Sequence, residues 1–162
     1  MKSIDRILEQ TNSMLLIDWP GEHCPSTLLR AGYVVFGHDP QGYARYELHA
    51  RKLVTYRLSD PPRQVDLAFC YRPLDELSEC VATAQKLGAK VFWYQSGFAG
   101  PSTEYCRGVW LPDDMREKAR RLVEKVGLVY IDEVYIADAV EALDICKPRH
   151  FPETAEIAKE AP

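Results

Sequence analysis

The segment VDLAFCYRPLDELSECVATAQKLGAKVFWYQSG, residues 65–97, decides the fold, because it has the pattern of a complete strand–helix–strand unit. Val65 to Tyr71 is a short, almost unbroken apolar run, which is typical of a parallel strand covered on both faces. Apolar residues then recur at helical spacing between Pro73, which suits a first helical turn, and Gly88, which suits a helix end. Val91 to Tyr94 predicts a second buried strand. The order and length of these parts predict a right-handed βαβ crossover.

Each strand of this unit is followed by polar or conformationally unusual residues. They are Tyr71, Arg72 and Pro73 after the first strand, and Gln95, Ser96 and Gly97 after the second. In open parallel sheets, ligands bind outside the carboxyl ends of the strands. We therefore expect a ligand crevice at these two strand ends, with plain solvated turns as the structural alternative.

The rest of the chain also alternates between predicted strands and helices. Strands are predicted at 14–17, 33–36, 65–71, 91–94 and 128–131, helices at 1–12, 25–31, 74–87, 113–126 and 137–143, and a β-ribbon or edge strand within 41–62. This alternation predicts an α/β, Rossmann-like, doubly wound domain, with a mostly parallel sheet and helices on both faces. The last strand is expected beside the 91–94 strand. A flavodoxin-like strand order is the open alternative.

The expected organisation has three parts. Residues 1–13 form an N-terminal helix, 14–145 form the Rossmann-like domain, and 146–162 form a polar C-terminal tail. Residues 98–113, rich in Gly, Pro and aromatics, form an irregular loop whose length is typical of segments that are functional or mediate contacts.

Composition limits the function classes. The chain has 162 residues, 46% hydrophobic and 27% charged, with a net charge of −4. The lack of a basic field argues against nucleic-acid binding, and no apolar run reaches the roughly 20 residues that span a bilayer. Five cysteines without CxxC spacing argue against a disulfide framework and a zinc site. We expect reduced thiols, no membrane association and a cytoplasmic protein.

Three blocks carry a resemblance to a known family. They are LLRAGYVVFGHDP (28–40), VDLAFCYRP (65–73) and GAKVFWYQSG (88–97). They resemble the small, single-domain CoA-binding Rossmann proteins, which are related to the CoA-binding domain of the succinyl-CoA synthetase α subunit. The resemblance covers roughly residues 14–140 and is most specific in 65–97. It implies non-catalytic binding of CoA or an acyl-CoA.

The resemblance also implies the site residues. Tyr71, Arg72 and Pro73 would line the nucleotide pocket, Asp39 and Pro40 would meet the adenosine end, Gln95, Ser96 and Gly97 would border the pantetheine path, and Trp19 and Gly21 would belong to the loop beside the pyrophosphate. Arg72 could pair with a phosphate, and Tyr71 could stack on a base.

The first loop departs from the glycine-rich pattern of this family. It has the sequence Asp18-Trp19-Pro20-Gly21, so a carboxylate stands where a phosphate would lie, and Pro20 and Pro25 remove two amide donors. If Trp19 packs over the Tyr71 end, we expect the pocket to be closed. A second hypothesis is therefore a degenerate member that does not bind CoA and acts through protein contacts, as a homodimer or other homo-oligomer.

Asp39 supports a third hypothesis, an NAD or nucleotide-sugar binding protein. It follows the first predicted strand by about 20 residues, where dinucleotide folds place an acid that holds the ribose hydroxyls. The sequence has no GxGxxG motif, and a turn-capping role before Pro40 is the structural alternative. No catalytic or metal-ligating constellation is evident, so we expect a binding module for a small-molecule nucleotide, with CoA favoured over NAD.

Overall fold

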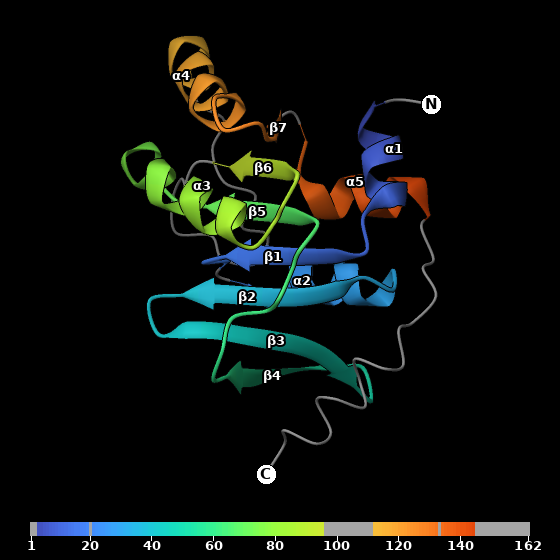
Figure 1. Ribbon diagram of the computed structural model, residues 1–162. Coiled ribbons are helices and arrows are strands. Elements are labelled where there is room, and N and C mark those ends of the chain that lie inside the picture. The colour runs from blue at the N-terminus through green and yellow to red at the C-terminus, as the bar shows by residue number, and fades with distance from the viewer. Residues whose placement is uncertain (1–2, 20, 96–111, 133, 145–162) are drawn as a thin grey trace.

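A seven-stranded sheet in the order β4-β3-β2-β1-β5-β6-β7 forms the centre of the domain (Figure 1). The computed structural model describes residues 3–19, 21–95, 112–132 and 134–144. The strands are β1 (Ser13–Ile17), β2 (Val34–Asp39), β3 (Gly42–His49), β4 (Lys52–Leu58), β5 (Leu67–Tyr71), β6 (Val91–Gln95) and β7 (Val129–Ile131). β2, β1, β5, β6 and β7 are parallel, and β3 and β4 form an antiparallel hairpin at the β2 side.

The strand order combines the two layouts that the sequence left open. Counted over the parallel strands alone, it is the flavodoxin-like order 2-1-3-4-5. With the neighbouring β3 included, it is the Rossmann order 3-2-1-4-5-6 with the third strand reversed. In both descriptions the chain leaves β1 toward β2 on one side and returns through β5 on the other. The carboxyl ends of β1, β2 and β5 therefore border the topological switch point.

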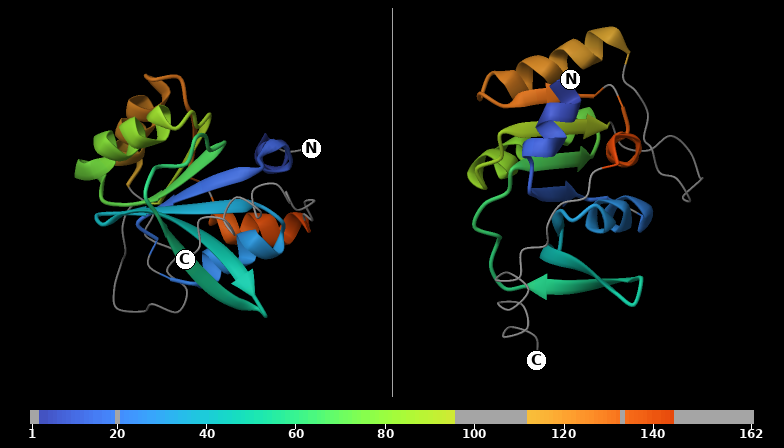
Figure 2. Two further views of the ribbon diagram at one scale, coloured as in Figure 1. Left: turned by 60° about the horizontal axis from the view of Figure 1, so that its bottom comes forward. Right: turned by 90° about the vertical axis from the view of Figure 1, so that its right-hand side faces the viewer.

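Helices cover both faces of this sheet, as predicted (Figure 2). One face carries α1 (Ser3–Gln10), α2 (His23–Arg30) and α5 (Ile136–Leu143), and the other carries α3 (Leu77–Lys86), which follows the short 3-10 turn η1 (Leu74–Glu76), and α4 (Asp113–Glu124). Successive side chains of a strand point to opposite faces, so β1 contributes Leu16 to the first core and Leu15 to the second. Among the described residues, no helix is long and apolar enough to cross a membrane.

The central βαβ unit has the predicted form. Every residue of β5 and β6 is buried, which explains why both strands have unbroken apolar sequences. Gly88 has φ +80° just after α3, the left-handed conformation that ends a helix at little cost for glycine. Pro73 occupies the N-cap position of the 3-10 turn η1. It therefore lies just before the first helical turn and not, as the sequence predicted, within it.

The second strand is longer than predicted. The sequence predicts a strand over 33–36, but β2 continues to Asp39. The reason is its antiparallel pairing with β3, in which Asp39 stands opposite Gly42. The ribbon expected within 41–62 is present as the β3–β4 hairpin. The loop expected at 98–113 falls mostly, and the tail at 146–162 wholly, outside the described residues.

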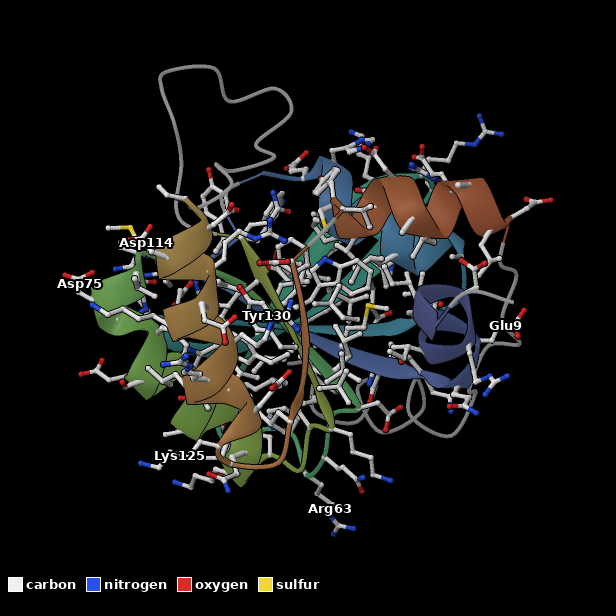
Figure 3. All side chains as sticks on the ribbon, turned by 90° about the horizontal axis from the view of Figure 1, so that it is seen from above. Glu9, Arg63, Asp75, Asp114, Lys125 and Tyr130 are labelled. Carbon is white, nitrogen blue, oxygen red and sulfur yellow. The ribbon has the colours of Figure 1, made fainter. Side chains whose placement is uncertain are left out.

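An ionic cluster around the buried Asp132 ties α4 to the end of β7. Asp132 is only 3% exposed and accepts two hydrogen bonds from Arg116, each 2.9 Å, and one from the Tyr130 hydroxyl at 2.9 Å. Burial alone would raise the pKa of Asp132, but the bonds from Arg116 and Tyr130 outweigh it and lower that pKa below its ordinary value. Tyr130 lies in the interior beside α4, whereas Lys125 points outward (Figure 3).

Candidate functional site

A cavity of about 290 Å³ opens at the switch point, between the carboxyl ends of β1, β2 and β5 and the first half of α3. The lining residues that matter chemically are Asp18, His38, Asp39, Arg72, Glu76 and Cys80. Ligand pockets for drug-sized molecules span roughly 300–1,000 Å³. This cavity is at the lower end of that range, so it suits a group of nucleoside size rather than a whole CoA molecule.

The wall nearest β1 is built by an ion-pair cluster. Asp18 follows β1 with φ +59°, and its amide donates to the His38 carbonyl at 2.7 Å, so the two strand ends are joined. Arg72, directly after β5, pairs with the carboxylates of both Asp18 and Glu76. Burial disfavours the charged form of Arg72, but Glu76 and Asp18 outweigh this effect and raise its pKa. The Arg72 guanidinium is therefore shared by two acids of the chain itself.

The opposite wall is formed by the end of β2. Asp39 accepts hydrogen bonds from both Nη atoms of Arg57 on β4, at 3.2 and 2.9 Å, and from the Gln41 amide at 2.8 Å. His38 packs on the Tyr43 ring at 4.6 Å between centroids. Burial lowers the pKa of His38 despite the opposing charges of Asp39 and Asp18, so this imidazole is neutral at pH 7.

Trp19 and Tyr71 lie on the other face of the sheet. The Trp19 indole is 9% exposed and packs edge-on against Phe69 at 4.9 Å and Tyr71 at 4.8 Å, and it stacks on Tyr135 at 5.5 Å. From the sequence alone, such packing predicts a closed pocket. The cavity beside Arg72 is nevertheless present, because Trp19 and Tyr71 belong to the α2–α5 core and do not line it.

The predicted site residues are thus divided between several places. Asp39, Pro40 and Arg72 line the cavity, whereas Gly21 and the exposed Pro73 do not. Gln95 is 1% exposed and ends β6, and its side-chain amide has no hydrogen-bond partner within the described part of the chain. Ser96 and Gly97 lie outside the described residues.

The structure adds residues that the sequence did not single out. Glu76, Glu79 and Cys80 come to the lining from η1 and α3, and Arg57, which is not in the lining, bonds to Asp39 from the β3–β4 hairpin. The spacing of Glu76, Glu79 and Cys80 after Arg72 could have predicted their place in the lining. A helix that follows a strand end presents its first turns to the crevice. Arg57 had no such signal, because it depends on the register of the hairpin.

The lining suits a nucleoside better than its phosphates. Four described lining residues are carboxylates (Asp18, Asp39, Glu76 and Glu79), and Arg72 is the only arginine or lysine among them. The Asp18 amide is already used by His38, and Pro25 removes a donor from the first turn of α2. Hydroxyl donors and an uncharged ring fit this environment, whereas phosphate oxygens find few donors.

A Rossmann-like sheet with a polar crevice at its switch point is the arrangement in which open α/β domains commonly hold nucleotides. The sequence matches the family described as CoA binding domain over residues 17–161, so the chain belongs to that family. No curated protein matches the sequence.

The fold is shared with solved structures, two of which are described below. One, described as Prb (PH1109 protein redesigned for binding), is 21% identical with a TM-score of 0.60, and the match covers 91% of this chain and 94% of that one. The other, cell-free ID.343 from Thermus thermophilus, is 16% identical with a TM-score of 0.58, and the match covers 88% and 99% of the two chains. At these identities the likeness concerns the fold.

Proposed function

We propose that the protein is a non-catalytic binding module for CoA or an acyl-CoA, with the adenosine end of the ligand in the cavity between β1, β2 and β5. The observation that carries this proposal is the position of the cavity, since open α/β sheets bind nucleotides at the switch point. Membership of the CoA binding domain family supports the choice of ligand. The presence of Asp39, Pro40 and Arg72 in the lining agrees with the roles that the family resemblance implies.

A thermal-shift panel tests this proposal. CoA, acetyl-CoA, NAD, NADP and ADP are each added in large excess, and the melting temperature is recorded. A ligand that binds only the folded chain, at about 100 times its dissociation constant, stabilises it by roughly 2.7 kcal/mol. We expect CoA or acetyl-CoA to raise the melting temperature by several degrees. A shift with NAD alone would favour the dinucleotide hypothesis, and no shift with any ligand would contradict nucleotide binding.

The Arg72 ion pairs give a second prediction. Glu76 and Asp18 share the guanidinium, so Glu76→Gln leaves more of its charge for a ligand phosphate, and Arg72→Gln removes the cation. We expect Glu76→Gln to tighten CoA binding several-fold and Arg72→Gln to weaken it roughly tenfold, as measured by calorimetric titration. Glu117→Gln on the exposed side of α4 is the matched control and should leave the affinity unchanged. Equal affinity in all three variants would remove Arg72 from the site.

A second candidate function, a protein-interaction module acting as a homo-oligomer, has its own supporting observation. Large apolar side chains are exposed near the β7 edge of the sheet: Met115 (42%), Val126 (36%), Val129 (48%) and Val134 (36%). Apolar side chains on an edge strand favour contacts with another chain. Light scattering over a range of concentrations distinguishes the two candidate functions. A chain that stays monomeric and binds CoA would exclude the homo-oligomeric interaction module.

We further propose that residues 14–145 make up the binding domain and that the protein is cytoplasmic. In support of the location, Cys24, Cys70 and Cys80 are all buried free thiols, which suits a reducing compartment.

A further inference from the structure

Two cysteine thiols meet at the wall of the cavity. Cys70 lies near the end of β5 and is fully buried, and Cys80 lies on the buried face of α3 and is 8% exposed. Both belong to the core between the sheet and the helices α3 and α4, and their thiols are hydrogen-bonded to each other. Of the two, Cys80 lines the cavity and Cys70 does not. The pair therefore has one thiol that a small molecule can reach and a second thiol directly behind it.

The two thiols differ in how readily they lose a proton. The hydrogen bond with Cys70 lowers the pKa of the Cys80 thiol, and the Arg72 guanidinium acts in the same direction. Burial and the carboxylates of Glu76 and Glu79 oppose this effect, but the pKa of Cys80 stays below its ordinary value. Burial, and then the hydrogen bond with Cys80, raises the pKa of Cys70 well above its ordinary value. Because the thiolate is the nucleophile, Cys80 is the reactive member and Cys70 keeps its proton.

Arg72 interacts with both sulfur atoms. Its backbone amide donates to the Cys70 sulfur, and its guanidinium stabilises negative charge on either thiol. Tyr94 stands opposite Cys70 on β6 and donates its hydroxyl proton to the Arg72 carbonyl at 2.9 Å, which fixes the backbone at this strand end. When Cys80 is bonded to another sulfur, it is no longer an anion, so the charge of Arg72 is left to stabilise a thiolate on Cys70.

We propose that Cys80 and Cys70 form a dithiol site that reacts by exchange with a small, uncharged disulfide in the cavity. The Cys80 thiolate attacks one sulfur of the disulfide and forms a bond to it, and the other half leaves as a thiolate that takes up a proton from water. Cys70 then loses its proton to water and attacks the Cys80 sulfur, which releases the second half as a thiolate that takes up this proton. In sum, the two cysteine thiols are oxidised to one disulfide, and the small disulfide is reduced to two thiols.

The lining determines the class of disulfide. Glu76 and Glu79 lie in the same wall as Cys80, and Asp18 is a third carboxylate, so an anionic disulfide meets repulsion. The volume of about 290 Å³ suits a small molecule. The proposal goes beyond nucleotide binding and does not depend on it, because it uses only the two cysteines, their neighbours and the cavity.

The test uses 2-hydroxyethyl disulfide, which is small and uncharged, and mass spectrometry. The parent chain carries Cys106→Ser and Cys146→Ser, so the three buried thiols are its only cysteines. We expect the folded parent chain to lose two hydrogen atoms, with a Cys70–Cys80 disulfide that peptide mapping locates and a reducing agent reverses. Cys24 is the internal control, because it lies in the core on the other face of the sheet and burial raises its pKa. Cys80 should react at least about tenfold faster than Cys24.

Two further variants of the parent chain separate the roles of the two thiols. In Cys70→Ser, the reaction should stop with one half of the probe joined to Cys80, because no second thiol is available. In Cys80→Ser, Cys70 should stay unmodified, since it is fully buried and does not line the cavity. A melting curve of each variant shows that it is folded at the temperature of the reaction.

Three results would overturn the inference. The first is a Cys80 that reacts no faster than Cys24, because the reaction then proceeds through unfolding. The second is a parent chain that stays unmodified or keeps one half of the probe without forming the Cys70–Cys80 disulfide. The third is a folded Cys80→Ser variant in which Cys70 reacts as fast as Cys80 does in the parent chain. If a serine variant does not fold, the mapped product of the parent chain decides. No reaction contains a nucleotide, so each result leaves the proposed function to its own test.

Discussion

Replacing Arg116 by alanine is expected to lower the free energy of unfolding by about 2–3 kcal/mol, because it takes a charged partner and two hydrogen bonds from the buried Asp132 carboxylate. Total stabilities of domains are about 5–15 kcal/mol, so this loss is a large part of the whole. Urea denaturation at pH 7 measures it. Arg121→Ala on the same helix is the matched control. That side chain is 79% exposed and its pair with Glu117 is on the surface, so its loss should cost less than about 1 kcal/mol.

Two further measurements test the cause. In an Asp132→Asn background, Arg116→Ala should cost much less, because no buried charge is left unpaired. The effect of pH has a definite sign. The pKa of Asp132 is lowered in the folded chain, so its contribution is present above the ordinary pKa of about 3.9 and is lost as the pH falls below it. The difference between wild type and Arg116→Ala should shrink from pH 7 toward pH 3, and a constant difference would contradict the ionic explanation.

Replacing Trp19 by alanine is also expected to cost about 3–5 kcal/mol of stability, because the indole fills the space between Phe69, Tyr71 and Tyr135. Ligand affinity should stay unchanged, since Trp19 lies on the face of the sheet opposite the cavity. Denaturant unfolding and calorimetric titration of the same preparations measure both quantities.

Trp19→Phe serves as the milder variant, since it keeps an aromatic ring in the core and should remain folded under titration conditions. A tenfold loss of CoA affinity in Trp19→Phe would return this residue to the ligand site. Unchanged stability of Trp19→Ala would contradict its role in packing.

Much of the fold was predictable because local signals agree with the tertiary structure. Residues 65–97 carry two unbroken apolar runs and a glycine at a left-handed position, and each feature has one good structural explanation. The predicted end of the second strand was wrong. Gly37 and His38 are typical turn residues, but pairing with β3 holds them extended. The cross-strand pairing of β2 with β3 overrides the preference of the individual residues.

The candidate site was only partly predictable. Asp39 and Arg72 could be found because they directly follow predicted strands. Arg57 could not, because its position depends on the register of the β3–β4 hairpin. The hairpin turn is made by Ala50 and Arg51, at φ +51° and +69°, where the usual Asn-Gly or Asp-Gly signal is missing. The sequence also did not predict which strand-end residues point to which face of the sheet. A shift of one residue in strand register moves every side chain to the opposite face.

The hairpin that carries Arg57 also affects the order in which the crevice is assembled. Asp39 and Arg57 are 18 residues apart and are joined by a local antiparallel ribbon, which forms on a timescale of roughly microseconds. Asp18 and Arg72 are 54 residues apart and meet only after the parallel strands β1 and β5 have paired, which requires a much slower closure of the chain. The Asp39–Arg57 pair can therefore form in the nascent chain before the rest of the cavity, whereas the Asp18–Arg72 pair forms only when the parallel sheet is complete.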